Sequence, residues 1–156
     1  MKPKIGITMG DPAGIGPEVI VKSLLDPGVL SLIDPLLIGI PQVFDRLSQS
    51  LDLPLPLSLV RSPGSAFGPG LKGIPLLPCG VPWDFQHGEP SQEGGESSFQ
   101  AIKTACQLAV DGTIDAVVTA PISKYSFHLA GHNYPGHTEL LSSLTGTKNY
   151  AMMLLS

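Results

Sequence analysis

The sequence predicts an α/β fold with a largely parallel β-sheet, because strand-like and helix-like segments alternate along the chain. Residues 5–8 (IGIT) form a short apolar run, which a glycine-rich loop and then a proline and an acid at the start of a helix follow. Residues 114–120 are the clearest strand, since β-branched residues dominate them and a turn containing glycine precedes them. Both segments therefore begin units in which a loop joins a strand to a helix.

The other expected elements lie between and after these two units. Residues 35–39 predict a second strand, and Pro41 opens a helix whose apolar residues fall on one face. Residues 53–83 contain many prolines and glycines, and we expect short strands, edge pieces and loops there. Residues 91–93 precede a longer helix with acids in its first turn. Residues 151–156 are apolar and predict the beginning of a further strand.

Composition restricts the class of protein. The 156 residues are 42% hydrophobic and 14% charged, which predicts a soluble globular unit with a real core. The net charge of −4 and the lack of a Lys/Arg cluster argue against nucleic acid and favour small-molecule partners. No run approaches the roughly 18 apolar residues of a membrane span, and the first ten residues do not resemble a signal peptide. We therefore expect a cytoplasmic protein without a membrane partner.

The two cysteines, Cys79 and Cys106, are isolated in the sequence. Neither belongs to a CxxC motif, so buried thiols in a reducing compartment are the preferred interpretation. A disulfide or a catalytic cysteine is the alternative.

The glycine-rich loop at residues 10–18 (GDPAGIGPE) is the first candidate site. Such a loop can direct free N–H groups and the positive end of a helix dipole at an anionic or polar ligand. It is not a phosphate-binding P-loop, because Pro17 and Glu18 stand where Lys and Ser/Thr are needed. It is not a dinucleotide fingerprint either, because Val19 replaces the third glycine. A tight turn from strand to helix without any ligand is the alternative.

Two later segments also combine turn residues with polar side chains. In residues 119–124 (TAPISK), a helix beginning at Pro121 would place Lys124 in its first turn, where an anionic ligand would offset the unfavourable dipole; a solvated lysine is the alternative. In residues 133–139 (NYPGHTE), Thr138 is a natural N-cap and could also bind a ligand. The helix dipole would keep His137 neutral, so that its imidazole could donate to a substrate oxygen.

The remaining histidines predict no metal site. His128 and His132 are four residues apart, but the glutamate of an HExxH motif is replaced by Leu129. A shared metal is the less favoured interpretation of this pair, and His87 is interpreted as a surface residue.

The motifs at residues 10–18, 88–101, 119–124 and 134–139, taken in this order, resemble the 4-hydroxythreonine-4-phosphate dehydrogenase family of pyridoxal phosphate biosynthesis. The first motif is also similar to the wider isocitrate and isopropylmalate dehydrogenase superfamily. The resemblance implies that fold in incomplete form. Residues 1–122 would belong to the first α/β domain, and residues 123–156 would begin a truncated second domain for substrate and metal.

The resemblance also implies a chemistry. Family members oxidise 4-phosphooxy-threonine with NAD or NADP, with decarboxylation to 3-amino-2-oxopropyl phosphate, and a divalent metal (Zn, Mg or Co) polarises the reacting oxygen. The matching substrate-binding residues are His137 and Thr138, and Asp11 and Lys124 are further candidates near the cleft. The metal ligands are expected beyond Ser156, and the catalytic and cofactor-binding residues remain unassigned.

The resemblance also bears on the assembly of the protein. The full-length family members are homodimers, and we expect the 156-residue chain alone to be inactive, with a sheet edge and an apolar face uncovered. The alternatives are a related dehydrogenase for 4-phosphothreonate or a cis-dihydrodiol, or a non-catalytic anion-binding fragment.

Overall fold

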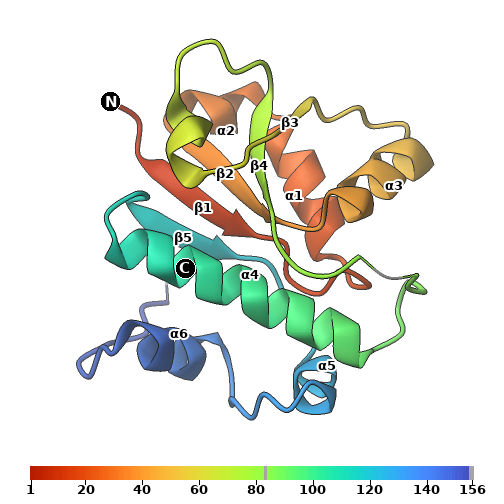
Figure 1. Cartoon of the computed structure of the whole chain (residues 1–156), viewed down its shortest axis with the longest axis vertical. Helices are drawn as coiled ribbons and strands as arrows, with labels where there is room; N and C mark the ends of the chain where they lie inside the picture. Colours follow the sequence, from red (N-terminus) through yellow and green to blue (C-terminus); the bar gives the residue numbers. More distant parts are fainter. Residues whose placement is uncertain (83, 155–156) are drawn as a thin grey trace.

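The computed structural model describes residues 1–82 and 84–154 and confirms the α/β class (Figure 1). Its strands form one parallel sheet in the order β3-β4-β2-β1-β5. The strands are β1 (Lys4–Thr8), β2 (Asp34–Gly39), β3 (Leu57–Leu59), β4 (Ile74–Pro78) and β5 (Ala116–Thr119). Because all of them run in the same direction, their carboxyl ends meet at one edge of the sheet, which is where ligands bind in open α/β folds.

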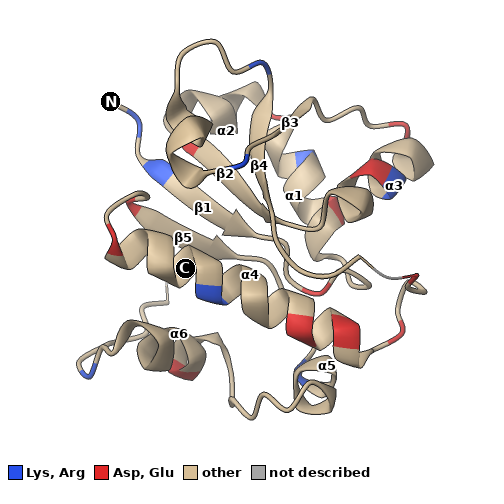
Figure 2. Ribbon diagram, viewed as in Figure 1, with Lys and Arg blue, Asp and Glu red and all other residues tan. Residues whose placement is uncertain are grey.

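Helices cover both faces of the sheet. They are α1 (Gly16–Leu24), α2 (Pro27–Leu32), α3 (Pro41–Leu51), α4 (Gln92–Val110), α5 (Lys124–Leu129) and α6 (His137–Thr145), with a short 3₁₀ helix η1 (Pro63–Phe67). None of the helices within the described ranges is long and apolar enough to cross a membrane. Basic and acidic residues are spread over several of these elements (Figure 2).

The core has two layers that follow the alternation of the strands. In β2, Leu37 packs with α1 and α3, whereas Leu36 and Ile38 pack with α4 on the opposite face. All three side chains are fully buried, as expected for a strand inside a parallel sheet covered on both sides. A third cluster joins α4 to α5 and α6, which lie on the side of α4 away from the sheet (Figure 1). The long helix α4 is therefore the common support of the sheet and of the last two helices.

Most predicted elements are confirmed, and two are wrong. The strand expected at 35–39, the helix opened by Pro41 and the helix after residues 91–93 are all present. The helix expected from Pro121 begins instead at Lys124, because the Ser123 side chain caps it by accepting from the Ser126 N–H at 3.2 Å. The strand expected at 151–156 is absent over 151–154, and the last two residues lie outside the described ranges.

The segment expected to hold short strands and loops contains an unexpected inner strand. β3 is an edge strand of three residues, but β4 lies between β3 and β2 although it includes Pro75 and Pro78. Pro78 is the last residue of β4, which limits its cost to the sheet.

At the opposite edge of the sheet, β5 pairs with β1 alone among the described strands. Val118 of β5 is 52% exposed, and an apolar groove of about 360 Å³ runs between β5 and α1. The outer edge of β5 is therefore unpaired in the described chain, and the groove beside it is lined mainly by apolar side chains.

Candidate functional site

The glycine-rich loop lies beside the segment that follows β5, because β1 and β5 are paired up to Thr8 and Thr119. Gly10 has a positive φ of 72°, and a Cβ there would overlap the Pro121 carbonyl oxygen and lie 2.9 Å from the Ala120 carbonyl carbon. The Asp11 N–H donates to the same Pro121 oxygen at 2.9 Å. The backbone of this loop therefore approaches the backbone of its neighbour, and only glycine fits at position 10.

Asp11, one of the predicted site residues, is 7% exposed and holds this loop in place. Its Oδ1 accepts from the Ala13 N–H at 2.9 Å, and its Oδ2 accepts from the Ser126 hydroxyl at 3.4 Å. The carboxylate thus closes a local turn and joins the loop to α5. A contact of Asp11 with substrate stays a prediction.

Lys124 lies at the first position of α5 and is exposed. The structure places its neighbour Ser126, two residues further on, against Asp11. α5 has only six residues, so its dipole is short. A contact of Lys124 with an anionic ligand stays a prediction.

The start of α6 differs from the prediction in its cap. The N-cap residue is Gly136, which offers no side-chain hydrogen bond, and the helix begins at His137. The interpretation of Thr138 as the N-cap is therefore wrong, because Thr138 is already the second helical residue. It is half-buried, and the free N–H groups of this first turn remain available to a bound oxygen.

His137 is half-buried at this helix start, and its Nε2 atom is fully buried without a hydrogen-bond partner among the residues that the structure describes. Burial lowers the pKa of His137 below its ordinary value, and a hydrogen bond to the backbone of Ala120 opposes the shift. The neutral imidazole expected from the sequence is supported, although burial rather than the helix dipole is the main cause. Ala120, whose backbone the ring contacts, directly follows the last residue of β5.

Thr8 was not predicted as a site residue, yet its Oγ1 is a second buried atom without a partner in the described part of the chain. Thr8 is the last residue of β1, and its carbonyl oxygen accepts from the Ala120 N–H at 3.3 Å. Its place at the carboxyl end of a central strand was the available signal, because ligands gather at that edge.

The side chains that could bind a metal do not gather at this edge of the sheet in the described residues. Within residues 1–82 and 84–154, no group of three or more His, Cys, Asp or Glu could hold a metal ion. His128 and His132 face different partners: Nδ1 of His128 lies 2.7 Å from Asn133 Oδ1, and His132 pairs with Glu96. The metal that the resemblance implies is therefore assigned to none of these residues.

The fold is therefore that of an α/β protein, and unpartnered polar groups of Thr8 and His137 lie near the carboxyl ends of β1 and β5. Residues 31–156 match the family model described as pyridoxal phosphate biosynthetic protein PdxA, and the chain belongs to this family.

Individual relatives give the same result. The chain is 43% identical over 155 residues to the 4-hydroxythreonine-4-phosphate dehydrogenase of Trichlorobacter lovleyi, covering 98% of this chain and 46% of the relative. It is 41% identical over 152 residues to the D-threonate 4-phosphate dehydrogenase of Salmonella typhimurium, covering 96% of this chain and 46% of the relative. A crystal structure of a 4-hydroxythreonine-4-phosphate dehydrogenase from Burkholderia phymatum matches with a TM-score of 0.90 and 38% identity, over 100% of this chain and 47% of that one. The chain thus spans about half the length of these relatives.

Proposed function

We propose that this chain contributes the substrate-binding end of α6 to a dehydrogenase that oxidises 4-phosphooxy-threonine with NAD or NADP. The family membership and the names of the relatives support the reaction class. On this proposal residues 1–122 and 123–156 begin two domains of a homodimeric cytoplasmic enzyme. α5 and α6, which open the second part, pack on α4 of the first.

The buried Nε2 of His137 is the observation that carries the proposal. A buried polar atom without a partner costs free energy, so its retention is explained by a ligand group that pairs with it. Because the one N–H of the neutral ring is used by the backbone of Ala120, the unpartnered nitrogen can accept a hydrogen bond from a substrate hydroxyl. Thr138 is the next residue of α6, and its hydroxyl and the free N–H groups of this first helical turn can bind a second oxygen of the same substrate.

The metal and the nicotinamide cofactor also belong to the proposal, and their binding residues stay unassigned in the part of the chain that the structure describes. When bound, a divalent metal (Zn, Mg or Co) would polarise the reacting oxygen as a Lewis acid, and the nicotinamide would accept the hydride. In the described ranges no side-chain group fits the metal. The loop at 10–18 packs against the backbone that follows β5 instead of forming a dinucleotide fingerprint. The chain's own role is to bind and orient the substrate.

Replacing His137 tests the proposal in the complete enzyme to which this chain contributes, assayed with a divalent metal and either cofactor. His137→Ala should lower kcat/KM by roughly 5- to 150-fold, equivalent to about 1–3 kcal/mol for a lost buried hydrogen bond. His87→Ala is the control, because His87 is an exposed histidine outside the site. An unchanged kcat/KM in His137→Ala would refute the assignment.

Oxidation of D-threonate 4-phosphate is a second candidate, because relatives almost as similar to this chain carry that name. The two substrates differ at an amino group, so their kcat/KM values in one preparation decide between them. Turnover of a cis-dihydrodiol, or phosphate binding without any reduction of NAD, would support the remaining alternatives.

A further inference from the structure

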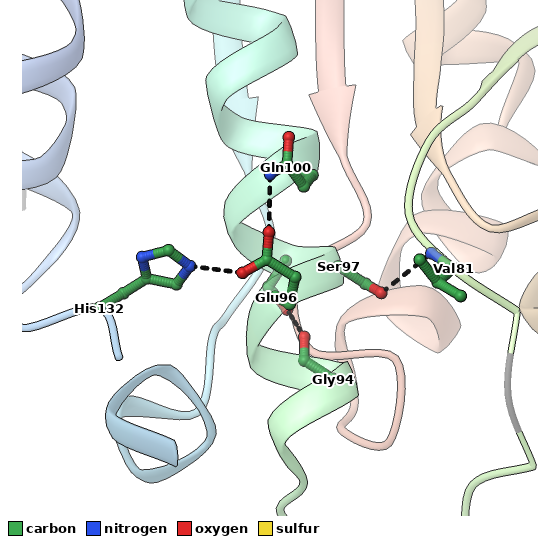
Figure 3. Close-up of polar contacts among 7 residues, drawn as sticks. Val81, Gly94, Glu96, Ser97, Gln100 and His132 are labelled. Carbon is green, nitrogen blue, oxygen red and sulfur yellow. Dashed lines mark hydrogen bonds and ion pairs between the residues drawn. The ribbon is translucent and has the colours of Figure 1, made fainter. Parts of the chain in front are cut away.

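A second polar cluster lies on α4, whose first turns carry acidic side chains (Figure 2). Figure 3 shows the Glu96 carboxylate between Gln100 of the same helix and His132 of the segment that joins α5 to α6. Glu96 Oε2 lies 2.7 Å from His132 Nε2, and the Gln100 amide donates to Glu96 Oε1 at 2.7 Å. Both carboxylate oxygens are therefore engaged, and His132 reaches the carboxylate from a different part of the chain.

Aromatic rings fix the His132 side chain in this position. The ring stacks on Phe99 of α4, with 3.7 Å between centroids and 16° between planes, and it meets the edge of Phe127 at 5.9 Å. Its side chain is only 19% exposed. The packing and the ion pair together leave the ring little freedom to turn.

The charge of Glu96 is also maintained. Hydrogen bonds from Gln100 and from His132 lower the pKa of Glu96, and the positive charges that act on it are those of His132 and Lys103. His128 of α5 lies 2.7 Å through its Nδ1 from Asn133 Oδ1, so it is engaged away from Glu96. The carboxylate therefore remains an acceptor for His132 throughout the neutral range.

This anchor lies just before the candidate substrate residues. His132 is five positions ahead of His137. The backbone N–H of His132 donates to the Phe127 carbonyl oxygen at 2.8 Å, and this bond fixes the chain after α5. α6 is held on α4 through the buried Leu140 and the partly buried Leu141 and Leu144, none of which lies at the start of the helix. The position of the α6 start therefore depends on the segment that precedes it.

We propose that Glu96 and His132 are positioning residues for His137 and Thr138, and that their bond fixes the segment between α5 and α6 so that both side chains face the substrate. The proposal rests on the proposed function for its role in binding. Neither Glu96 nor His132 is required to touch the substrate.

The placement of His137 can be measured in the chain itself by imidazole NMR during a pH titration. Glu96→Ala should release the segment and move the His137 midpoint upward, toward the ordinary histidine value of about 6.5. His132→Phe keeps an aromatic ring to stack on Phe99 and should give the same shift, which guards against a variant that merely fails to fold. Glu93→Gln, an exposed carboxylate one turn earlier on α4, is the matched control. An unmoved His137 midpoint in a folded Glu96→Ala variant would overturn the proposal.

A kinetic cycle then distinguishes this proposal from the proposed function. In the active enzyme, Glu96→Ala should raise the KM for the phosphorylated substrate roughly 3- to 10-fold while kcat and the KM for the cofactor change little. In a His137→Ala/Thr138→Ala background the same substitution should have no further effect, because it acts through those two residues. Additive losses would contradict a positioning role. If the His137 midpoint moves but no substrate parameter does, the placement is supported and the function assigned to His137 is wrong.

Discussion

The contact between α4 and α5 can be tested at Gly95, which faces α5 from the first part of α4. A Cβ at this position would overlap the carbonyl group of Ser126 and lie 2.9 Å from the Phe127 nitrogen. These neighbours are backbone atoms, so they cannot rotate away as a flexible side chain could. Gly95→Ala must therefore push the two helices apart, and Ser126 would move away from Asp11 with them.

The expected magnitude follows from two opposing effects. Gly→Ala in a free helix interior stabilises by about 1 kcal/mol, because alanine is the better helix former. Overpacking costs about 1–3 kcal/mol, and a rigid backbone neighbour favours the upper end of that range. The net effect is a loss of about 2 kcal/mol in the free energy of unfolding, which lowers the Tm of a chain this long by about 4–8 °C.

Thermal and urea unfolding followed by circular dichroism measure this loss. Gly64→Ala is the matched control, because a Cβ on Gly64 would meet nothing within 4 Å. The control should unfold within about 0.5 kcal/mol of the wild type. A Gly95→Ala variant as stable as the wild type, or more stable, would refute the close packing of α4 and α5.

Three further predictions concern ionisable side chains. Asp11→Ala should lower the free energy of unfolding by about 1–3 kcal/mol, because the buried Ala13 N–H loses its acceptor, whereas Asp11→Asn keeps one oxygen and should lose less; equal losses in urea unfolding would contradict this. Burial raises the pKa of the Cys79 and Cys106 thiols, so iodoacetamide should react more slowly with the folded chain than with the chain in urea, and equal rates would argue against buried thiols. The pKa of Glu96 is lowered on folding, so its contribution to stability is present above the ordinary carboxyl range and is lost as the pH falls through the lowered value. The stability difference between wild type and Glu96→Gln should therefore shrink between about pH 6 and about pH 3, and a constant difference would show that no such linkage exists.

The parts of the fold that were predictable depend on local signals. Pro17 and Pro41 lie in the first turns of α1 and α3, and Ser91 caps α4 by accepting from the Gly94 N–H at 3.0 Å. Each signal acts within a few residues, so it can be read without knowledge of tertiary contacts. The start of α5 was misplaced because Pro121 and Ser123 both favour the start of a helix. In the structure the Ser123 side chain accepts from the Ser126 N–H, so the helix begins after Ser123.

The site was predictable only in part, since its state depends on residues far apart in sequence. The motif at 134–139 identified His137 and Thr138 as candidates, but the burial of the His137 ring and its bond to the distant backbone of Ala120 arise only in the folded chain. The pairing of His132 with Glu96 spans 36 positions, and the sequence showed only two histidines four residues apart. A separation of that size leaves no local pattern from which the pair could be derived.

The glycine-rich loop could be a ligand-binding loop or a tight turn, and the acceptors of its backbone N–H groups distinguish the two. Three of its N–H groups already have acceptors: that of Asp11 donates to Pro121, that of Ala13 to the Asp11 side chain, and that of Gly14 to the Asp11 carbonyl. A loop that has used these donors on its own chain has fewer to offer an anion, so the structure favours the tight turn over the ligand cradle. The start of α6 has the opposite character, because Gly136 caps it without a side chain and a buried imidazole nitrogen lies beside it without a partner in the described ranges. The loop therefore supports the edge of the sheet, and the unused polar groups at the start of α6 are the ones that fit the proposed binding of substrate.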